Sequence, residues 1–347
     1  MLHHAYVADN HPYAPIHGGN VNPCSLAVAG CDVWRLVDRC GSGVSERADC
    51  DPRRDGAPYH AADIRGRISG GGTAVDVVGL GAFWGAGAGR GCLGQPADGG
   101  AAKVGLFVAA GFFFGQISNS NAHELIHRGG RFMHRLGKWV YISLLFGHHT
   151  SAHVLVHHRH VATREDPSTS RLGESYYRFA PRAWRGSFRK GLAIETERQR
   201  RIGAPRYAHP YVSYVLGAVG FIAASALIGG LKGALIYVAL ASFSTSQLLL
   251  SDYIQHYGLM RKVIDGKPEP VGPRHSWNSP HWFSSAVMLN APRHSDHHAH
   301  PSRPYDTLII PEGSPMLPRS LPMMATLALF PRRWRKVMDP LAAKWAE

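Results

Sequence analysis

Residues 104–128 read VGLFVAAGFFFGQISNSNAHELIHR, an apolar run that passes directly into a polar segment with two histidines. His123 and His127 are four residues apart, so on a helix that continues from the apolar run both imidazoles project from the same face. Two imidazoles on one helical face can bind the same metal ion. The stretch therefore predicts an apolar helix that carries a metal site at its polar end.

Other histidines repeat this spacing further along the chain. Residues 153–158 read HVLVHH, residues 253–258 read YIQHYG, and residues 294–298 read HSDHH. Nine imidazoles exceed what one four-coordinate zinc ion uses, and they suit two metal ions with positions open for oxygen. Imidazole favours iron, zinc, copper or nickel, and our interpretation is a dinuclear iron centre. The predicted ligands are His123, His127, His153, His157, His158, His256, His294, His297 and His298.

Two longer apolar stretches follow at residues 211–228 and 233–251. Each is long enough to cross a hydrocarbon core of ~30 Å, and only residues 229–232 separate them, which predicts a helical hairpin. With residues 104–120, at least three membrane spans are visible.

Positive charge is concentrated in one segment. Lys and Arg total 38 against 24 Asp and Glu, for a net charge of +14, and residues 128–206 alone carry 16 basic and five acidic residues. The positive-inside rule places this segment, and with it every histidine motif, on the cytoplasmic side. The segment lacks the aromatic interleaving of a nucleic-acid binder, so we expect no nucleic-acid partner. We predict an all-α integral-membrane helix bundle with a histidine-rich di-iron cap in the cytoplasm.

The composition changes abruptly near residue 103. Residues 1–102 are rich in Gly, Arg, Asp and Pro and remain unassigned, with disorder or a shifted reading frame as hypotheses, while residues 103–347 form the predicted membrane domain. Within that domain, residues 137–147 are too short to span and are expected at the membrane interface. Residues 321–338 are expected to form an amphipathic piece that anchors on the membrane surface.

Six motifs, in this order, resemble those of the membrane-bound alkane 1-monooxygenases of the integral-membrane fatty acid desaturase and hydroxylase superfamily: HELIHR, HVLVHH, RHVATREDPSTSRLGESYYRF, SDYIQHYGL, HSWNS and RHSDHHAHPSRPYDTL. The resemblance runs roughly from Phe113 to Met338. It implies O₂-dependent hydroxylation of the terminal methyl group of an alkane or similar apolar substrate. It also implies two irons held by the nine histidines, on the cytoplasmic side of a bacterial inner membrane.

An external electron donor is expected. The five cysteines lie within the first 92 residues without a C-x-x-C spacing, and no dinucleotide fingerprint is present. The resemblance implies rubredoxin or ferredoxin, reduced by an NAD(P)H-dependent reductase. The basic segment would suit docking of such an acidic partner.

The chain departs from the family pattern beside two of the histidines. The family implies a glutamate before His153 and before His256, where this chain has Ala152 and Gln255. It also implies further membrane helices before the first histidine motif, which residues 1–100 do not provide.

Two aspartates are expected to orient imidazoles by accepting the second ring N–H. Asp252 lies one turn before His256, and Asp296 lies within the last histidine motif.

Two alternative functions stay open. A fatty acyl desaturase or a xylene-type side-chain hydroxylase would use the same metals. A membrane zinc protease of the H-E-x-x-H type would use His123 and His127 as ligands and Glu124 as general base, and it would leave the other seven histidines without a role.

Overall fold

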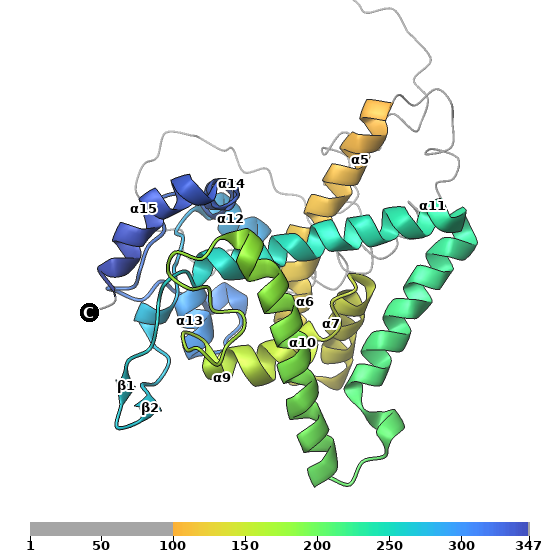
Figure 1. Cartoon of the computed structure of the whole chain (residues 1–347), viewed down its shortest axis with the longest axis horizontal. Helices are drawn as coiled ribbons and strands as arrows, with labels where there is room; N and C mark the ends of the chain where they lie inside the picture. The colour runs from red at the N-terminus through yellow and green to blue at the C-terminus, as the bar shows by residue number, and fades with distance from the viewer. Residues whose placement is uncertain (1–99, 346–347) are drawn as a thin grey trace, which may run out of the picture. The chain divides into compact units, whose positions relative to one another are not determined.

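The computed structural model describes residues 100–345, and most of this part of the chain is helical (Figure 1). The all-α prediction is confirmed to that extent, with a single short hairpin of strands β1 (Val263–Ile264) and β2 (Lys267–Pro268). The interpretation of the N-terminal segment lies outside the described residues.

The apolar run and the first histidine motif form one continuous helical path, as predicted. It consists of α5 (Gly100–Phe112), the π-helical turn η2 (Phe113–Ser118) and α6 (Asn119–Ile126). Gly115 packs tightly against the long helix α11 (Pro210–Gln255), because a Cβ atom here would lie 2.4 Å from the Gln247 amide nitrogen. Gln247 in turn donates to the Gly111 carbonyl at 2.8 Å. These contacts fix the direction in which α6 carries its histidines.

The predicted hairpin is confirmed in α11 (Pro210–Gln255), whose helical backbone is broken at Gly230. Gly230 has φ 64° and ψ −163°, a conformation that glycine adopts without steric cost. Figure 1 shows the two limbs diverging from this bend. Among the described residues, α11 is the one helix that is long and apolar enough to cross a membrane. Leu227 and Leu231, on either side of the bend, are 86% and 77% exposed.

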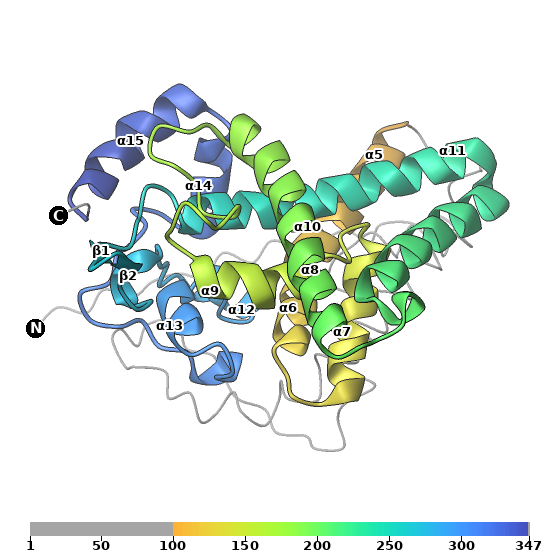
Figure 2. The same cartoon turned by 60° about the horizontal axis from the view of Figure 1, so that its bottom comes forward.

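The remaining helices surround the polar ends of α6 and α11. The first of these helices, α7 (Arg131–Ser143), packs closely on α6 at Gly137. A Cβ atom at this glycine would lie 2.8 Å from the Ala122 carbonyl oxygen. Figure 2 shows α8, α9 and α13 near one another beside α6. The helices are α7 (Arg131–Ser143), α8 (His149–Ala152), η3 (His153–His157), α9 (His158–His160), α10 (Tyr176–Arg201), η4 (Arg206–Ala208), η5 (Pro273–His275), α12 (Trp282–Val287), α13 (His294–Ala299), η6 (Tyr305–Thr307), α14 (Leu321–Ala328) and α15 (Pro331–Ala343).

The C-terminal helix packs on protein through its apolar face. In α15, Trp334 is fully buried against Tyr253 and Tyr257, with ring centroids 5.3 Å and 5.2 Å away. The Tyr257 hydroxyl donates to the Asp339 carboxylate at 2.6 Å. The expectation that this face lies on the membrane surface is therefore wrong for α15, because its apolar side chains are buried against the protein, with Trp334 on Tyr253 and Tyr257. This packing supports the end of α11, next to His256.

Replacing Trp334 with alanine is expected to lower the free energy of unfolding by about 3–5 kcal/mol, because a large buried ring is removed from the packing between α15 and α11. Equilibrium unfolding in detergent micelles, followed by circular dichroism, measures this loss. Trp282→Ala is the control, because Trp282 is 78% exposed and its removal should change the free energy by less than about 0.5 kcal/mol. Equal losses in the two variants would contradict the assignment.

Candidate metal centre

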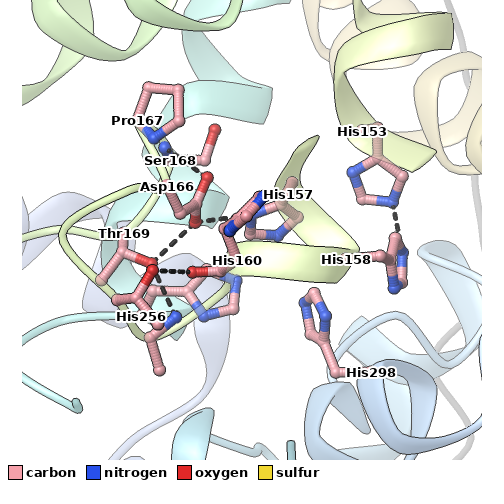
Figure 3. Close-up of polar contacts among 12 residues, drawn as sticks. His153, His157, His158, His160, Asp166, Pro167, Ser168, Thr169, His256 and His298 are labelled. Carbon is pink, nitrogen blue, oxygen red and sulfur yellow. Dashed lines mark hydrogen bonds and ion pairs between the residues drawn. The ribbon is translucent and has the colours of Figure 1, made fainter. Parts of the chain in front are cut away.

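All nine histidines singled out from the sequence converge, in two adjacent groups. Within each group, one ring nitrogen of every member lies within 4.8 Å of the corresponding nitrogens of the others. Figure 3 shows part of this convergence, with His153 and His158 on the right, His157 and His256 further to the left, and His298 below and between them. The five-histidine group consists of His123, His127, His153, His158 and His297. The four-histidine group consists of His157, His256, His294 and His298.

A π-helical turn divides the second motif between the two groups. His153 and His158 enter the five-histidine group, whereas His157 enters the four-histidine group. In an α-helix, a residue five positions further on lies about 140° around the axis. The wider η3 turn brings His158 back toward His153, to an Nε2–Nε2 distance of 3.0 Å. Sequence reasoning assumed α-helical faces and therefore did not find this division.

The Nε2 atoms approach one another closely. His123 and His158 each lie within 3.0 Å of His153 Nε2, and His297 Nε2 lies 3.2 Å from His158 Nε2. In the four-histidine group, His294 Nε2 lies 3.0 Å from His256 Nε2 and 3.1 Å from His298 Nε2. Two nitrogens bound to one metal ion at ~2.1 Å and 90° apart would be about 3.0 Å from each other. The spacing therefore fits imidazoles that share a metal ion.

Burial keeps these imidazoles neutral, the form that binds metals. The pKa values of His123, His153 and His298 are lowered well below the ordinary value of histidine, mainly by desolvation. Neighbouring imidazoles lower them further. Desolvation likewise lowers the pKa of His127 to about 4. The Nε2 atom of His127 is also buried without a hydrogen-bond partner. Neutral nitrogens that face one another without donors are the chemistry of a site for a cation.

His157 differs because a carboxylate contacts its ring. Its Nδ1 lies 2.8 Å from the Asp166 Oδ2 atom (Figure 3). Burial lowers the pKa of His157, but the charge and hydrogen bond of Asp166 outweigh burial and raise it overall. The pKa of Asp166 is lowered, because the hydrogen bonds and charge of its partners outweigh its desolvation. Sequence reasoning did not single out Asp166, although this residue lies in the motif RHVATREDPSTSRLGESYYRF, which is part of the family resemblance.

The two aspartates that were expected to orient imidazoles have other contacts. Asp296 accepts from Arg303 at 2.7 Å, from His300 at 2.9 Å and from the Ile309 backbone N–H at 3.0 Å. These donors hold the segment after α13 rather than one of the nine rings. Asp252 is buried and accepts from the Ser168 side chain.

Both departures from the family pattern fit their surroundings. The Gln255 amide donates to the Ala291 carbonyl at 3.1 Å, a contact that an ionised glutamate could not make, since a carboxylate has no donor. Its oxygen accepts from Ser251 at 2.8 Å. Ala152 is buried, and its Cβ lies 3.3 Å from where a Cβ at Gly191 would be, so α8 and α10 pack closely there.

Glu124 is bound by other groups. One oxygen lies 2.5 Å from the Arg128 guanidinium and accepts from the Tyr305 backbone N–H at 3.4 Å. A protease base would instead need to reach a water on the metal. His123 and His127 also share their group with three further imidazoles. This arrangement favours an all-histidine centre over the H-E-x-x-H protease site.

Lowering the pH from 6.5 toward 4 is expected to destabilise the metal-free protein. An unfolded histidine titrates near 6.5, whereas burial lowers the pKa of His127 to about 4 and that of His148 to about 3. The unfolded chain therefore binds more protons in this window, and stability is lost as the pH falls through it. Chelator-treated protein can be unfolded thermally at pH 7.5 and 5.0. A melting temperature that does not fall at pH 5.0 would contradict the burial of neutral imidazoles.

Known proteins are similar to this chain in sequence. A family model for fatty acid desaturases matches residues 100–310. Alkane 1-monooxygenase of Pseudomonas putida is 37% identical over 247 residues, which cover 70% of this chain and 61% of that protein. Alkane 1-monooxygenase 2 of Pseudomonas aeruginosa is 34% identical over 241 residues, covering 69% of this chain and 64% of the relative. The match thus spans less than two thirds of the length of these relatives.

A more distant relative is the hydroxylase component of the xylene/toluene monooxygenase of Pseudomonas putida. It is 26% identical over 220 residues, which cover 61% of this chain and 57% of that protein. The resemblance to alkane 1-monooxygenases stated from the motifs is confirmed. With the desaturase model matching more than half of its residues, the chain belongs to the fatty acid desaturase family.

Proposed function

We propose that this chain catalyses the O₂-dependent hydroxylation of an alkyl C–H bond, at the terminal methyl group of an alkane or a similar apolar substrate. One observation carries the proposal: nine buried or half-buried imidazoles meet in two adjacent groups beside an apolar helical hairpin. The names of the relatives supply the substrate class.

Two iron ions are the proposed cofactors, one in each histidine group. Imidazole ligands suit iron, and when bound the iron pair would activate O₂ for insertion into a C–H bond. The nine histidines named above would be the ligands. Asp296 would hold the segment after α13, and Asp252 would hold Ser168 and place a carboxylate charge near His157.

The chain itself supplies neutral donors and excludes water. His256, His294 and His298 are each at most 5% exposed, so few waters can reach their nitrogens. Water exclusion protects an oxidising site from side reactions. Exposed apolar side chains along α5 and α11 match a lipid environment in which an alkane would dissolve. We propose an integral protein of the bacterial inner membrane, with the histidine groups on the cytoplasmic side.

An acidic electron donor would dock on the basic segment. Arg159, Arg164 and Arg171 are exposed and follow directly after the second histidine motif. We propose rubredoxin or ferredoxin with its NAD(P)H-dependent reductase as the source of the two electrons that each turnover needs.

A second candidate is hydroxylation of the methyl group of xylene or toluene, or desaturation of a fatty acyl chain. The relation to the xylene/toluene monooxygenase component and the match to the desaturase model favour it. Both reactions would keep the same metal ligands, so product identity separates them from alkane hydroxylation.

Membranes that contain the protein and a reducing system are expected to convert a linear alkane to the 1-alkanol with one oxygen atom from ¹⁸O₂. His298→Ala should abolish the product, because a buried member of the four-histidine group is lost. His300→Ala, two residues further on and with a side chain 53% exposed, is the control and should keep activity. Mass spectrometry of products from alkane, xylene and fatty acyl substrates measures the outcome. Product only from xylene or the acyl chain would favour the second candidate.

Glu124→Gln should keep part of the hydroxylase activity, since this carboxylate is paired with Arg128 rather than facing the imidazoles. A protease would lose all activity in this variant and keep it in His294→Ala. Parallel assays of alkane oxidation and casein cleavage on both variants separate the two classes.

Reduction of the protein by its donor should slow as ionic strength rises, because exposed arginines would attract an acidic partner through charges that salt screens. Stopped-flow reduction at ~0.05 and ~0.5 M salt checks this expectation. Arg164→Glu should reproduce the high-salt rate at low salt, whereas Lys232→Glu at the far end of the hairpin should not. A reduction rate that does not depend on salt would contradict the proposed electrostatic docking of the donor.

A further inference from the structure

Asp166 is a buried carboxylate with three bound donors. Its side chain has no exposed surface, and it contacts His157 Nδ1 at 2.8 Å. The Thr169 hydroxyl donates to Oδ2 at 2.7 Å, and the Ser168 backbone N–H donates to Oδ1 at 3.0 Å. A buried carboxylate is costly unless it is hydrogen-bonded, so these donors fix both its position and its charge.

This contact decides which nitrogen of His157 carries the proton. An ionised carboxylate only accepts hydrogen bonds, so Nδ1 must donate, and in the neutral ring Nε2 then keeps a free lone pair. The Nε2 atom is buried and has no hydrogen-bond partner. His157 belongs to the four-histidine group with His256, His294 and His298. Asp166 therefore holds one ring of that group in the tautomer and orientation that a metal ligand needs.

The two groups differ in their carboxylate contacts. The Nδ1 atoms of His153 and His158 are buried without a hydrogen-bond partner, as are those of His294 and His298 in the four-histidine group. Within residues 100–345, none of the five rings of this group has a carboxylate among its hydrogen-bond partners. Carboxylates behind imidazole ligands raise their basicity, and their removal typically weakens metal binding by ~10–100-fold.

We propose that Asp166 is a positioning residue that makes the two groups unequal, so that the four-histidine group holds its metal ion more tightly than the five-histidine group. The inference rests on the proposed di-iron function. It also predicts the order in which the two groups release their iron. The five-histidine group would lose its iron first, although it offers one more nitrogen.

Release of iron tests this proposal without reference to turnover. Detergent-extracted protein enriched in ⁵⁷Fe can be titrated with a ferrous chelator, while Mössbauer spectra follow the iron that stays bound. The wild type should release its iron in two equal steps, with a different spectral component lost in each. In Asp166→Asn, which keeps an acceptor oxygen without the charge, the later step should move to ~10–100-fold lower chelator concentration. The earlier step and its spectral component should stay unchanged.

Glu165→Gln is the matched control, because the neighbouring carboxylate is 71% exposed and pairs only with Lys190. This variant should behave as the wild type does. An unchanged later step in Asp166→Asn, or an equal shift of both steps and both components, would overturn the proposal. Absence of bound iron from the wild type would instead overturn the proposed function, so the two failures are distinguishable.

Discussion

The structure depends on one electrostatic constraint, the close approach of nine imidazole nitrogens inside a buried volume. The Nε2 atoms of neighbouring rings lie about 3 Å apart, and some have no hydrogen-bond donor facing them. Bringing so many neutral acceptors together without a cation costs free energy, because each lone pair loses its water. Folding energy from elsewhere in the chain must therefore hold the rings in place until metal ions bind.

The apolar helices provide part of that support. A tight contact at Gly115 fixes η2 against α11, and one at Gly137 fixes α6 against α7, so that His123 and His127 reach the centre from one direction. The packing of Trp334 on Tyr253 and Tyr257 holds the end of α11, where His256 enters from another direction. The same scaffold thus supports both the apolar helices and the histidine groups, as the proposed oxidation of an apolar substrate requires.

Much of the fold follows from local patterns in the sequence. The apolar run before His123 predicts a helix, and the short break around Gly230 predicts a hairpin, because both depend on neighbouring residues alone. The nine histidines could be chosen for the same reason, since their spacing places them on helical faces. The spacing alone does not say which of the nine histidines meet in the folded chain. Their role as iron ligands stays a prediction.

Features that depend on distant partners or on non-standard helical turns could not be predicted. The π-helical turn at His153–His157 sends neighbouring histidines to different groups, and nothing in the spacing distinguishes it from an α-helix. Asp166 becomes important only because a loop folds back onto His157. Asp296 looked suitable by sequence, yet Arg303 and His300 occupy its oxygens. The sequence of α15 predicted an apolar face that binds the membrane surface, whereas in the structure this face packs on the aromatic side chains of Tyr253 and Tyr257.

The most direct test is the metal content of the membrane-extracted protein, in atoms per chain, beside a His297→Ala variant. The account predicts about two irons per wild-type chain and a loss of iron in the variant, because His297 is one of the five converging imidazoles. A single zinc ion that survives the substitution would contradict it.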